Sequence, residues 1–324
     1  MVDASSFWFA NPGGGFAYNG VATQSLRFND DDNANLKFDP SGASNQKTWV
    51  CSAWVKKTAN GNNPNAGNDR LIFNTFTAGN NANCAVMGFR NDKPFYSTYG
   101  VEVLVATQVC RDTSAWYHLV WALDTTQATD TNRLKIYLNG VAITSFSVDN
   151  RDNAYLDQDN DLAINNGNEV RIGNAGASSS PLSPFDGYIA EMNFIDGQSF
   201  FSDTSGTANS SFNINSFGEL KNGVWIPKDT SGLTFGTNGF RLDFADNAVD
   251  APESEGSEDT DNIGSDSSGE HNNFTATGIV ASDCAMPDSP ENNFATMNGI
   301  QSSAGTTTFS EGNLRITNSG ARSY

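Results

Sequence analysis

The chain has 324 residues and a formal net charge of −19, from 37 acidic and 18 basic side chains. This excess of acid repels phosphate backbones, which excludes nucleic acid as a general partner. No apolar run approaches the ~20 residues that a spanning helix needs, and the N-terminus lacks a basic leader with an apolar core. We therefore expect no membrane insertion and no signal peptide. The 37% hydrophobic residues suffice for a core, in one large sandwich with appendages or in two domains.

Residues 1–24 are expected to form an N-terminal attachment arm. The aromatic residues Phe7, Trp8 and Phe9 precede Asn11-Pro12-Gly13-Gly14-Gly15, which cannot continue a regular element and acts as a joint. Two interpretations stay open. The segment is a terminal strand that packs on its own domain, or its aromatic side chains contact a neighbouring subunit, since exposed aromatic clusters mark contact sites. The second interpretation predicts a homo-oligomer with subunit contacts at Phe7, Trp8 and Phe9.

From Ser25 onward, strand signals follow one another at short spacing between clusters of turn residues. The expected strands are Ser25–Phe28, Thr48–Lys56, Arg70–Phe76, Ala85–Phe89, Phe95–Tyr99, Val101–Gln108, Trp116–Leu123, Arg133–Leu138, Val141–Phe146, Glu169–Gly173, Phe185–Ile195, Gly223–Pro227 and Gly239–Phe244. Asn139-Gly140 between two alternating runs is a strong hairpin signal. Many strands and no amphipathic helix predict an all-β protein, an antiparallel β-sandwich.

The stretch from Phe185 to Asp196 is expected to be the central strand, because apolar side chains lie on both faces of its period-two pattern. Strict alternation places Tyr188, Met192 and Phe194 on one face and Ile189 on the other. A strand of this kind is covered on both sides.

The rest of the chain divides by composition. The sandwich is expected to span 25–247, followed by an acidic flexible excursion at 248–272, which self-repels. A connector that packs on the sandwich follows at 273–305, and the segment 306–324 is expected to be the first strand of a further β-domain.

Several motifs, in their order and spacing, resemble the laminin-G-like, concanavalin-A-like jelly-roll family. They are Ser25–Phe28, Thr48-Trp49 with Trp54-Val55-Lys56, Trp116–Val120, Leu134–Gly140 and Asp186–Glu191. The resemblance spans 25–246 and implies a jelly roll that binds glycans or proteins, often with a calcium ion near the loops.

A second resemblance is to virion structural proteins of tailed phages. It is carried by Tyr188–Asp196, Trp225–Lys228, Asp266–Phe274 and Asp288–Asn298. In that group the stretch around Asn292-Asn293-Phe294 joins the jelly roll to a second sandwich, often of SPRY type. The resemblance implies a tail fibre or similar appendage, a trimer if it is a fibre, displayed on the virion surface after assembly in the host cytoplasm. Its arm would bind other virion proteins.

The loop Asp157-Gln-Asp159-Asn-Asp161 places three carboxylates at alternate positions, where they could converge on Ca²⁺. The motif of a helix-loop-helix calcium loop fails, because Leu162 replaces its glycine and Asn168 its bidentate Glu. A loosely built calcium site and a solvated acidic loop both remain open. Cys51, Cys84, Cys110 and Cys284 lack zinc-site spacing, and their disulfide state is left open.

No catalytic residue is predicted. The chain has two histidines, and His118 lies in a two-sided strand, where a satisfied structural histidine is expected. No Glu-x-Asp-x-x-Glu run, Gly-x-Ser-x-Gly motif or phosphate-cradling loop occurs. Glu191 and Asp196 are expected on opposite faces of their strand and cannot form an acid pair locally.

Sugar rings stack on exposed aromatic rings, and their hydroxyls bond to Asn, Asp and Gln. Tyr96, Tyr99 and Tyr155 are the ligand-binding candidates if they are exposed, with ordinary packing as the alternative. We expect a non-enzymatic protein that binds a host surface glycan or receptor for adsorption. Two alternatives stay open: a capsid or tail decoration or connector without a ligand, and a polysaccharide depolymerase on the same fold.

Overall fold

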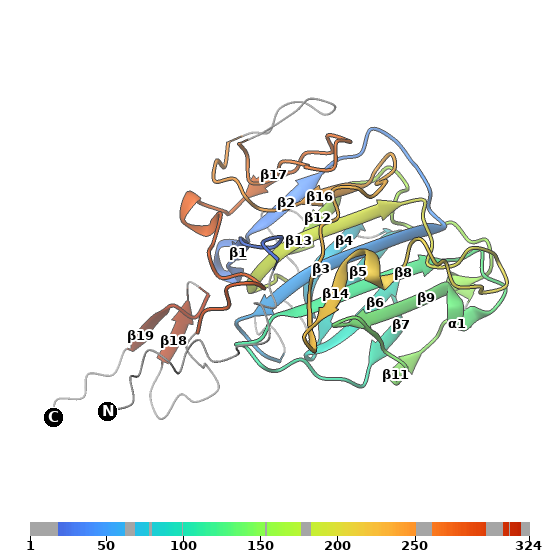
Figure 1. The fold of residues 1–324 in the computed structure, drawn as a ribbon, viewed down its shortest axis with the longest axis horizontal. Helices are drawn as coiled ribbons and strands as arrows, with labels where there is room; N and C mark the ends of the chain where they lie inside the picture. The colour runs from blue at the N-terminus through green and yellow to red at the C-terminus, as the bar shows by residue number, and fades with distance from the viewer. Residues whose placement is uncertain are drawn as a thin grey trace.

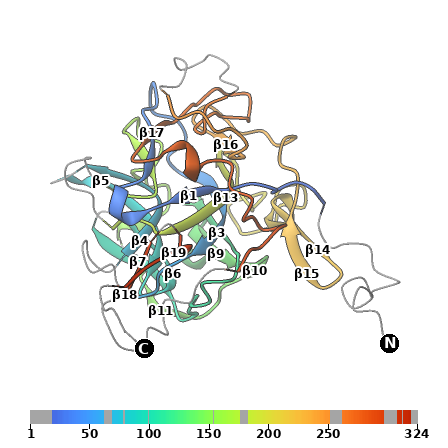
Figure 2. The same cartoon turned by 90° about the vertical axis from the view of Figure 1, so that its left-hand side faces the viewer.

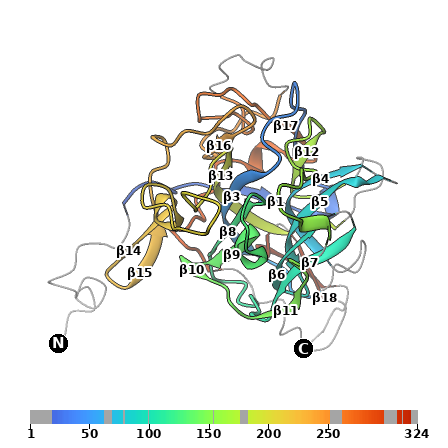
Figure 3. The ribbon, with the colours of Figure 1, turned by 90° about the vertical axis from the view of Figure 1, so that its right-hand side faces the viewer.

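The computed structural model describes residues 19–61, 69–77, 80–98, 100–152, 154–175, 183–250, 261–295, 307–310 and 312–318. In these residues the protein is an all-β sandwich of two antiparallel sheets, which lie face to face in Figure 3. The fold-class prediction is confirmed. Within the same residues, no helix has the length and apolar character that a bilayer crossing requires.

The first sheet has, in spatial order, β1 (Leu26–Phe28), β13 (Gly187–Asp196), β3 (Thr48–Lys57), β8 (Tyr117–Asp124), β9 (Leu134–Leu138) and β10 (Val141–Ala142), with β16 (Phe240–Leu242) also paired to β13. The second has β11 (Phe146–Asp149), β7 (Val101–Ala106), β6 (Lys93–Thr98), β5 (Asn80–Arg90), β4 (Asp69–Thr77), β12 (Val170–Ile172), β2 (Asn35–Phe38) and β17 (Thr275–Thr277).

Two hairpins and five short helical turns complete the described structure. The hairpins are β14 (Gly218–Lys221) with β15 (Val224–Pro227), and β18 (Thr307–Ser310) with β19 (Arg315–Asn318). The helical turns are α1 (Asp130–Arg133) and the 3-10 helices η2 (Asp30–Asp32), η3 (Ala154–Leu156), η4 (Ile214–Ser216) and η5 (Ala281–Asp283). In Figure 1, α1 and the β18–β19 hairpin lie at opposite ends of the long axis.

Strand β13 lies inside the first sheet, between β3 on one side and the short edge strands β1 and β16 on the other, and it is buried along its whole length, as its two-sided pattern predicts. Its alternation is nevertheless broken. The register with β3 shifts between Ala190 and Asn193, where Glu191 adopts a φ of 44°. Such a bulge adds one residue and reverses the faces beyond it.

The bulge corrects the predicted faces of β13. Ile189, Met192 and Phe194 point into the core between the sheets, whereas Tyr188 points to the outer face of the first sheet. The prediction that Tyr188 shares a face with Phe194 is therefore wrong. A single extra residue is enough, because the side-chain period of a strand is two.

The interior contains most of the large apolar side chains. Trp49 and Trp121 are fully buried there, and the Phe194 ring lies 5.6 Å from Phe240 and 5.3 Å from Phe73 between centroids. Burial of such rings contributes about 1.5–3 kcal/mol each. All four cysteines are buried free thiols.

The outer face of the first sheet is covered as well. The segment after β13 places Phe200, Phe212, Phe217 and Phe235 over Val50, Val120, Ala122 and Ile195. Figure 2 shows the β14–β15 hairpin beyond the same sheet. Three covers therefore share this face: the phenylalanine-rich segment, the β14–β15 hairpin and the chain from Met286 to Ala295.

Several predicted elements differ from the structure. The strand expected at 141–146 is two strands in opposite sheets, because Ile143 turns into the core and the chain crosses between the layers. Strands β2, β14 and β17 are not predicted. Their short runs carry little periodic signal.

The acidic flexible excursion expected at 248–272 is wrong over its described parts, 248–250 and 261–272, where Ala248 pairs with Asn262. Ile263 is buried in the core, and Asp266 accepts hydrogen bonds from the backbone N–H groups of Arg241 and Asn272. Hydrogen bonds of this kind stabilise a carboxylate within a folded segment, so the acidic side chains here do not force the segment to unfold. At the C-terminal end, the expected single strand is a hairpin, because Gly312 and Asn313 both have a φ of 61°. Its place in a further domain stays a prediction.

Candidate functional site

Two surface features lie at opposite ends of the sandwich. The first is the rim loop, residues Tyr155–Asp161, which lies beside α1. The second is the Tyr188 pocket, lined by Tyr188, Met286, Pro287, Asp288, Phe294, Ala295 and Leu314.

The backbone of the rim loop is fixed to the sandwich by hydrogen bonds. The buried Arg133 donates from Nη1 to the Leu156 carbonyl at 2.9 Å. The Thr125 hydroxyl donates to the Asn160 carbonyl at 2.9 Å, and the Thr125 backbone carbonyl accepts from the Asp159 N–H at 2.8 Å. Leu156 is fully buried. These bonds hold the loop at both ends of its turn. The backbone positions from which its exposed side chains extend are therefore fixed.

The side chains of the rim loop combine an aromatic ring with polar groups. Tyr155 is 40% exposed, and Asp157, Gln158 and Asp159 are exposed next to it. Gln158 donates from Nε2 to the Thr126 carbonyl at 3.1 Å, which leaves its amide oxygen as an acceptor at the surface. Tyr155 therefore meets the condition set for a sugar-stacking residue, and its binding stays a prediction.

The three carboxylates predicted to converge on calcium do not come together. The Asn160 N–H bonds to the Asp157 carbonyl, and Asp159 has a φ of 63°, so the segment is a turn rather than an extended run. The Lys47 ammonium nitrogen Nζ lies 3.9 Å from Asp159 Oδ1 and 4.0 Å from Asp161 Oδ1, so these two carboxylates have a lysine as their neighbour. Nowhere in the described part of the chain are three His, Cys, Asp or Glu side chains arranged to hold a metal ion. Calcium binding by the protein stays untested.

The other sequence candidates have different outcomes. Tyr96 is fully buried between the sheets, with its ring 6.0 Å from that of Trp49, so it cannot stack on a ligand. Its alternation on β6 turns it inward, and the prediction for this residue is wrong. Tyr99 and the aromatic residues Phe7, Trp8 and Phe9 lie outside the described residues.

The Tyr188 pocket is built on a buried lysine. Lys56, next to Tyr188 across β3 and β13, donates from Nζ to Asp288 Oδ2 at 2.7 Å, to Asn293 Oδ1 at 2.8 Å and to the Phe294 carbonyl at 2.6 Å. All three ammonium donors are thus used. Trp116 donates from Nε1 to Asp288 Oδ1 at 3.1 Å. These bonds fix the chain from Asp288 to Phe294 on the sheet.

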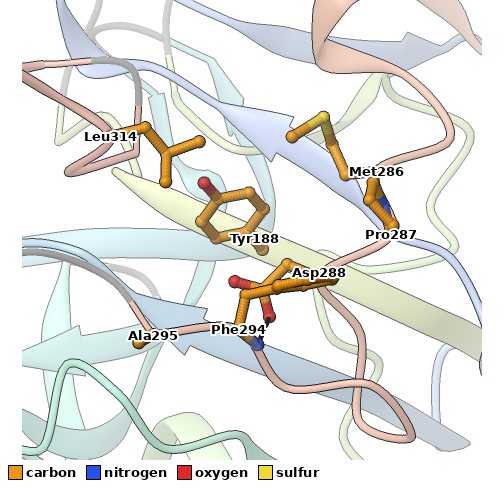
Figure 4. A pocket seen from close by; sticks show the side chains of 7 residues that line it. All are labelled: Tyr188, Met286, Pro287, Asp288, Phe294, Ala295 and Leu314. Carbon is orange, nitrogen blue, oxygen red and sulfur yellow. Dashed lines mark hydrogen bonds between the residues drawn. The ribbon is translucent and has the colours of Figure 1, made fainter.

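The cavity itself is small and apolar. Its volume is about 230 Å³, and Figure 4 shows Tyr188 between Leu314, Met286 and Phe294. Phe294 is 45% exposed and Leu314 51% exposed, so the opening faces solvent. The Tyr188 hydroxyl donates to the Gly312 carbonyl at 3.3 Å, and burial raises the pKa of this phenol. The phenol therefore stays neutral at physiological pH and serves as part of the wall.

The buried Ser52–His118 contact has no hydrolytic geometry. His118 Nε2 lies 2.9 Å from Ser52 Oγ, while Nδ1 accepts a hydrogen bond from Trp225 Nε1 at 3.0 Å. The ring proton must then reside on Nε2, so this nitrogen cannot accept the serine proton. Burial lowers the pKa of His118 to about 3. The prediction of a satisfied structural histidine is confirmed.

The two carboxylates considered as an acid pair have separate partners. Glu191 is bound by the Arg241 guanidinium, with 2.6 Å from Nη2 to Oε1. Asp196 accepts from the Asn165 side chain at 2.9 Å and from the Asn238 N–H at 3.1 Å. Both are therefore bound as structural groups.

Sequence reasoning missed the pocket because its wall comes from three distant segments. Tyr188 lies on β13, Met286 to Ala295 follow η5, and Leu314 lies in the turn of the last hairpin. The exposed Phe294, within the Asn-Asn-Phe motif, is the one signal that pointed to this region.

Comparison with protein-family models found no match, and no curated protein matches the chain. Among solved structures, the chain is similar to a pentraxin from Limulus polyphemus, with 11% identity and a TM-score of 0.40 over 61% of this chain and 83% of that one. A proposed carbohydrate-binding protein from Bacteroides ovatus has 16% identity and a TM-score of 0.47 over 80% and 59%. Domains LG4-5 of the mouse laminin α1 chain have 10% identity and a TM-score of 0.37 over 60% and 47%.

The matches thus span less than two thirds of the Bacteroides protein and of the laminin fragment. None of these similarities assigns a ligand or an activity to this chain.

Proposed function

We propose that this protein is a non-catalytic binding module on the surface of a tailed-phage virion, as a tail fibre or similar appendage. It engages a host surface glycan through the rim loop, and its N-terminal arm contacts other virion proteins or a neighbouring subunit. The virion assignment rests on the sequence resemblance of the segments around Tyr188, Trp225 and Asn292.

The observation that supports glycan binding is the chemistry of the rim loop. A partly exposed Tyr155 ring stands beside the exposed polar side chains Asp157, Gln158 and Asp159 on a backbone fixed by Arg133. Aromatic faces and oxygen acceptors are the two components of sugar recognition. A pre-ordered loop loses little conformational entropy on binding, which favours affinity.

The first test measures adhesion of the soluble protein to susceptible host cells. We expect Tyr155→Ala to weaken adhesion about fivefold, because one stacked ring contributes on the order of 1 kcal/mol. Tyr155→Phe keeps the ring and should bind nearly as the wild type does. The control is Leu220→Ala, which removes a side chain that is 71% exposed on β14, away from the rim loop.

The proposal makes two further demands. The soluble protein should compete with infection, and antibodies to this chain should label intact particles. Equal adhesion to resistant cells that lack the glycan would refute receptor recognition. Release of reducing ends from host polysaccharide would show a depolymerase instead of a binding module.

A further inference from the structure

The Tyr188 pocket has the size and polarity of a receptor for one aromatic side chain. An apolar cavity of about 150 Å³ is large enough to bind benzene. The Tyr188 pocket, at about 230 Å³, accommodates one larger ring and is below the ~300 Å³ at which small-molecule sites begin. Its single carboxylate, Asp288, is already bound by Lys56 and Trp116. The pocket therefore favours an apolar ring over a sugar.

The N-terminal arm leaves the folded body beside this pocket. The Glu291 carboxylate accepts hydrogen bonds from the backbone N–H groups of Asn19, Gly20 and Val21, at 3.3, 2.7 and 2.9 Å. Glu291 is three residues from Phe294, which lines the pocket. Asn19 also donates from Nδ2 to the Pro227 carbonyl at 2.8 Å. The root of the arm is thus fixed to the chain segment Met286 to Ala295, which supplies one side of the pocket.

The arm carries matching side chains at a suitable distance. Residues 10–18 separate the aromatic segment Phe7–Phe9 from Asn19, and nine extended residues span at most about 30 Å. Among residues 1–18, only Asp3 is charged.

We propose that the Tyr188 pocket binds the aromatic segment Phe7–Phe9 of a second copy of this chain. Because each arm starts beside a pocket, neighbouring copies can exchange arms in a closed, symmetric assembly. A net charge of −19 makes two bodies repel one another, whereas a nearly neutral arm bridges them without close approach. This inference rests on the subunit contact in the proposed function and names the site that receives it.

The test mixes two single variants of the full chain, Trp8→Cys and Leu314→Cys, under mild oxidation. The four native cysteines are buried, so the introduced thiols react first. We expect a disulfide between positions 8 and 314, identified by mass spectrometry, which can only join different chains. The matched control mixes Trp8→Cys with Tyr155→Cys and should give little product. Tyr155 lies on the rim loop, which Arg133 of α1 holds, and α1 is at the opposite end of the long axis from the β18–β19 hairpin in Figure 1.

Light scattering supplies the second measurement. Wild-type protein should exceed the 34.7 kDa mass of one chain, and Leu314→Asp should raise the dissociation constant at least tenfold, because it places a charge against an apolar ring. A monomeric wild type, or a disulfide found only within one chain of a double variant, would overturn the proposal. Tyr155→Ala should keep the assembly, so a failure of arm exchange is distinguishable from a failure of glycan binding.

Discussion

Buried polar residues in this protein hold the covers of the first sheet in place. His118 is fully buried, stacks on Trp54 at 4.7 Å between ring centroids and bonds to Trp225 of the β14–β15 hairpin. Lys56 does the same for the chain from Asp288 to Phe294. Removing one partner of such a group leaves a buried charge or donor unsatisfied, which costs about 1–5 kcal/mol. Each of these residues links a distant segment to the sheet.

His118 gives a pH prediction. Its folded pKa of about 3 lies below the ordinary value of 6.5, because burial disfavours the charged ring. The stability from the neutral ring is therefore complete above pH 6.5 and is lost as pH falls toward 3. Between pH 7 and pH 5 the wild type should lose about 2 kcal/mol more unfolding free energy than His118→Gln. Urea denaturation at both pH values measures this difference.

The glutamine amide can accept from Trp225 and donate to Ser52, so the variant keeps both contacts without the titration. His271→Gln removes the other histidine and is the matched control, expected to follow the wild type. Parallel pH profiles for wild type and His118→Gln would contradict the prediction.

At the scale of elements, the Asn139-Gly140 turn decides how β9 and β10 fit against the β14–β15 hairpin. Asn139 and Gly140 have φ values of 48° and 80°, as the predicted Asn-Gly hairpin turn requires. Gly140 also lies beneath Trp225, because a Cβ atom there would be 2.7 Å from the indole ring. The glycine thus serves both the turn and the seating of the β14–β15 hairpin.

Gly140→Ala should therefore destabilise the protein more than a turn substitution alone. Gly223, with a φ of 81°, has open space around its Cβ position and provides the control. We expect Gly223→Ala to cost about 1 kcal/mol, from left-handed strain, and Gly140→Ala about 1–3 kcal/mol more, from overpacking against Trp225. Chemical denaturation gives both values. Equal losses would show that the indole moves aside freely.

For the whole molecule, the dominant electrostatic feature is the net charge of −19. Self-repulsion of exposed carboxylates acts over the screening length, which falls from about 30 Å at 0.01 M salt to about 8 Å at 0.15 M. The innermost ion pairs, Lys56–Asp288 and Lys57–Asp92, are nearly inaccessible to solvent and are screened much less. Salt should therefore stabilise the fold, because it screens the repulsion between carboxylates on the surface.

We expect the melting temperature to rise by about 2–4 °C over this salt range, for a gain of about 1 kcal/mol. At equal ionic strength, Ca²⁺ and Mg²⁺ should give the same rise, because the rim carboxylates do not converge. Differential scanning calorimetry measures both. A larger shift in Ca²⁺ that a chelator reverses would establish a calcium site after all.

Local patterns predicted most of the strands and the burial of β13. Phe185–Asp196 has apolar residues on both faces, and burial follows from that alone. The faces themselves were mispredicted, because the bulge at Glu191 depends on the pairing with β3 and β16. Tyr155 was named as a candidate from its residue type, and its exposure became known only from the fold. Tyr96, of the same residue type, is buried because its strand turns it inward.

The sequence by itself determined the sheet class, the hairpin at Asn139-Gly140 and the acidic surface, because these depend on side-chain period, turn conformation and charge count. Only the tertiary structure decided the Tyr188 pocket. Its lining residues are up to 126 positions apart, from Tyr188 to Leu314. Their meeting depends on Lys56, which holds Asp288 and Phe294 against the first sheet. No local sequence pattern predicts these contacts, because their free energy comes from burial between segments that are far apart in the sequence.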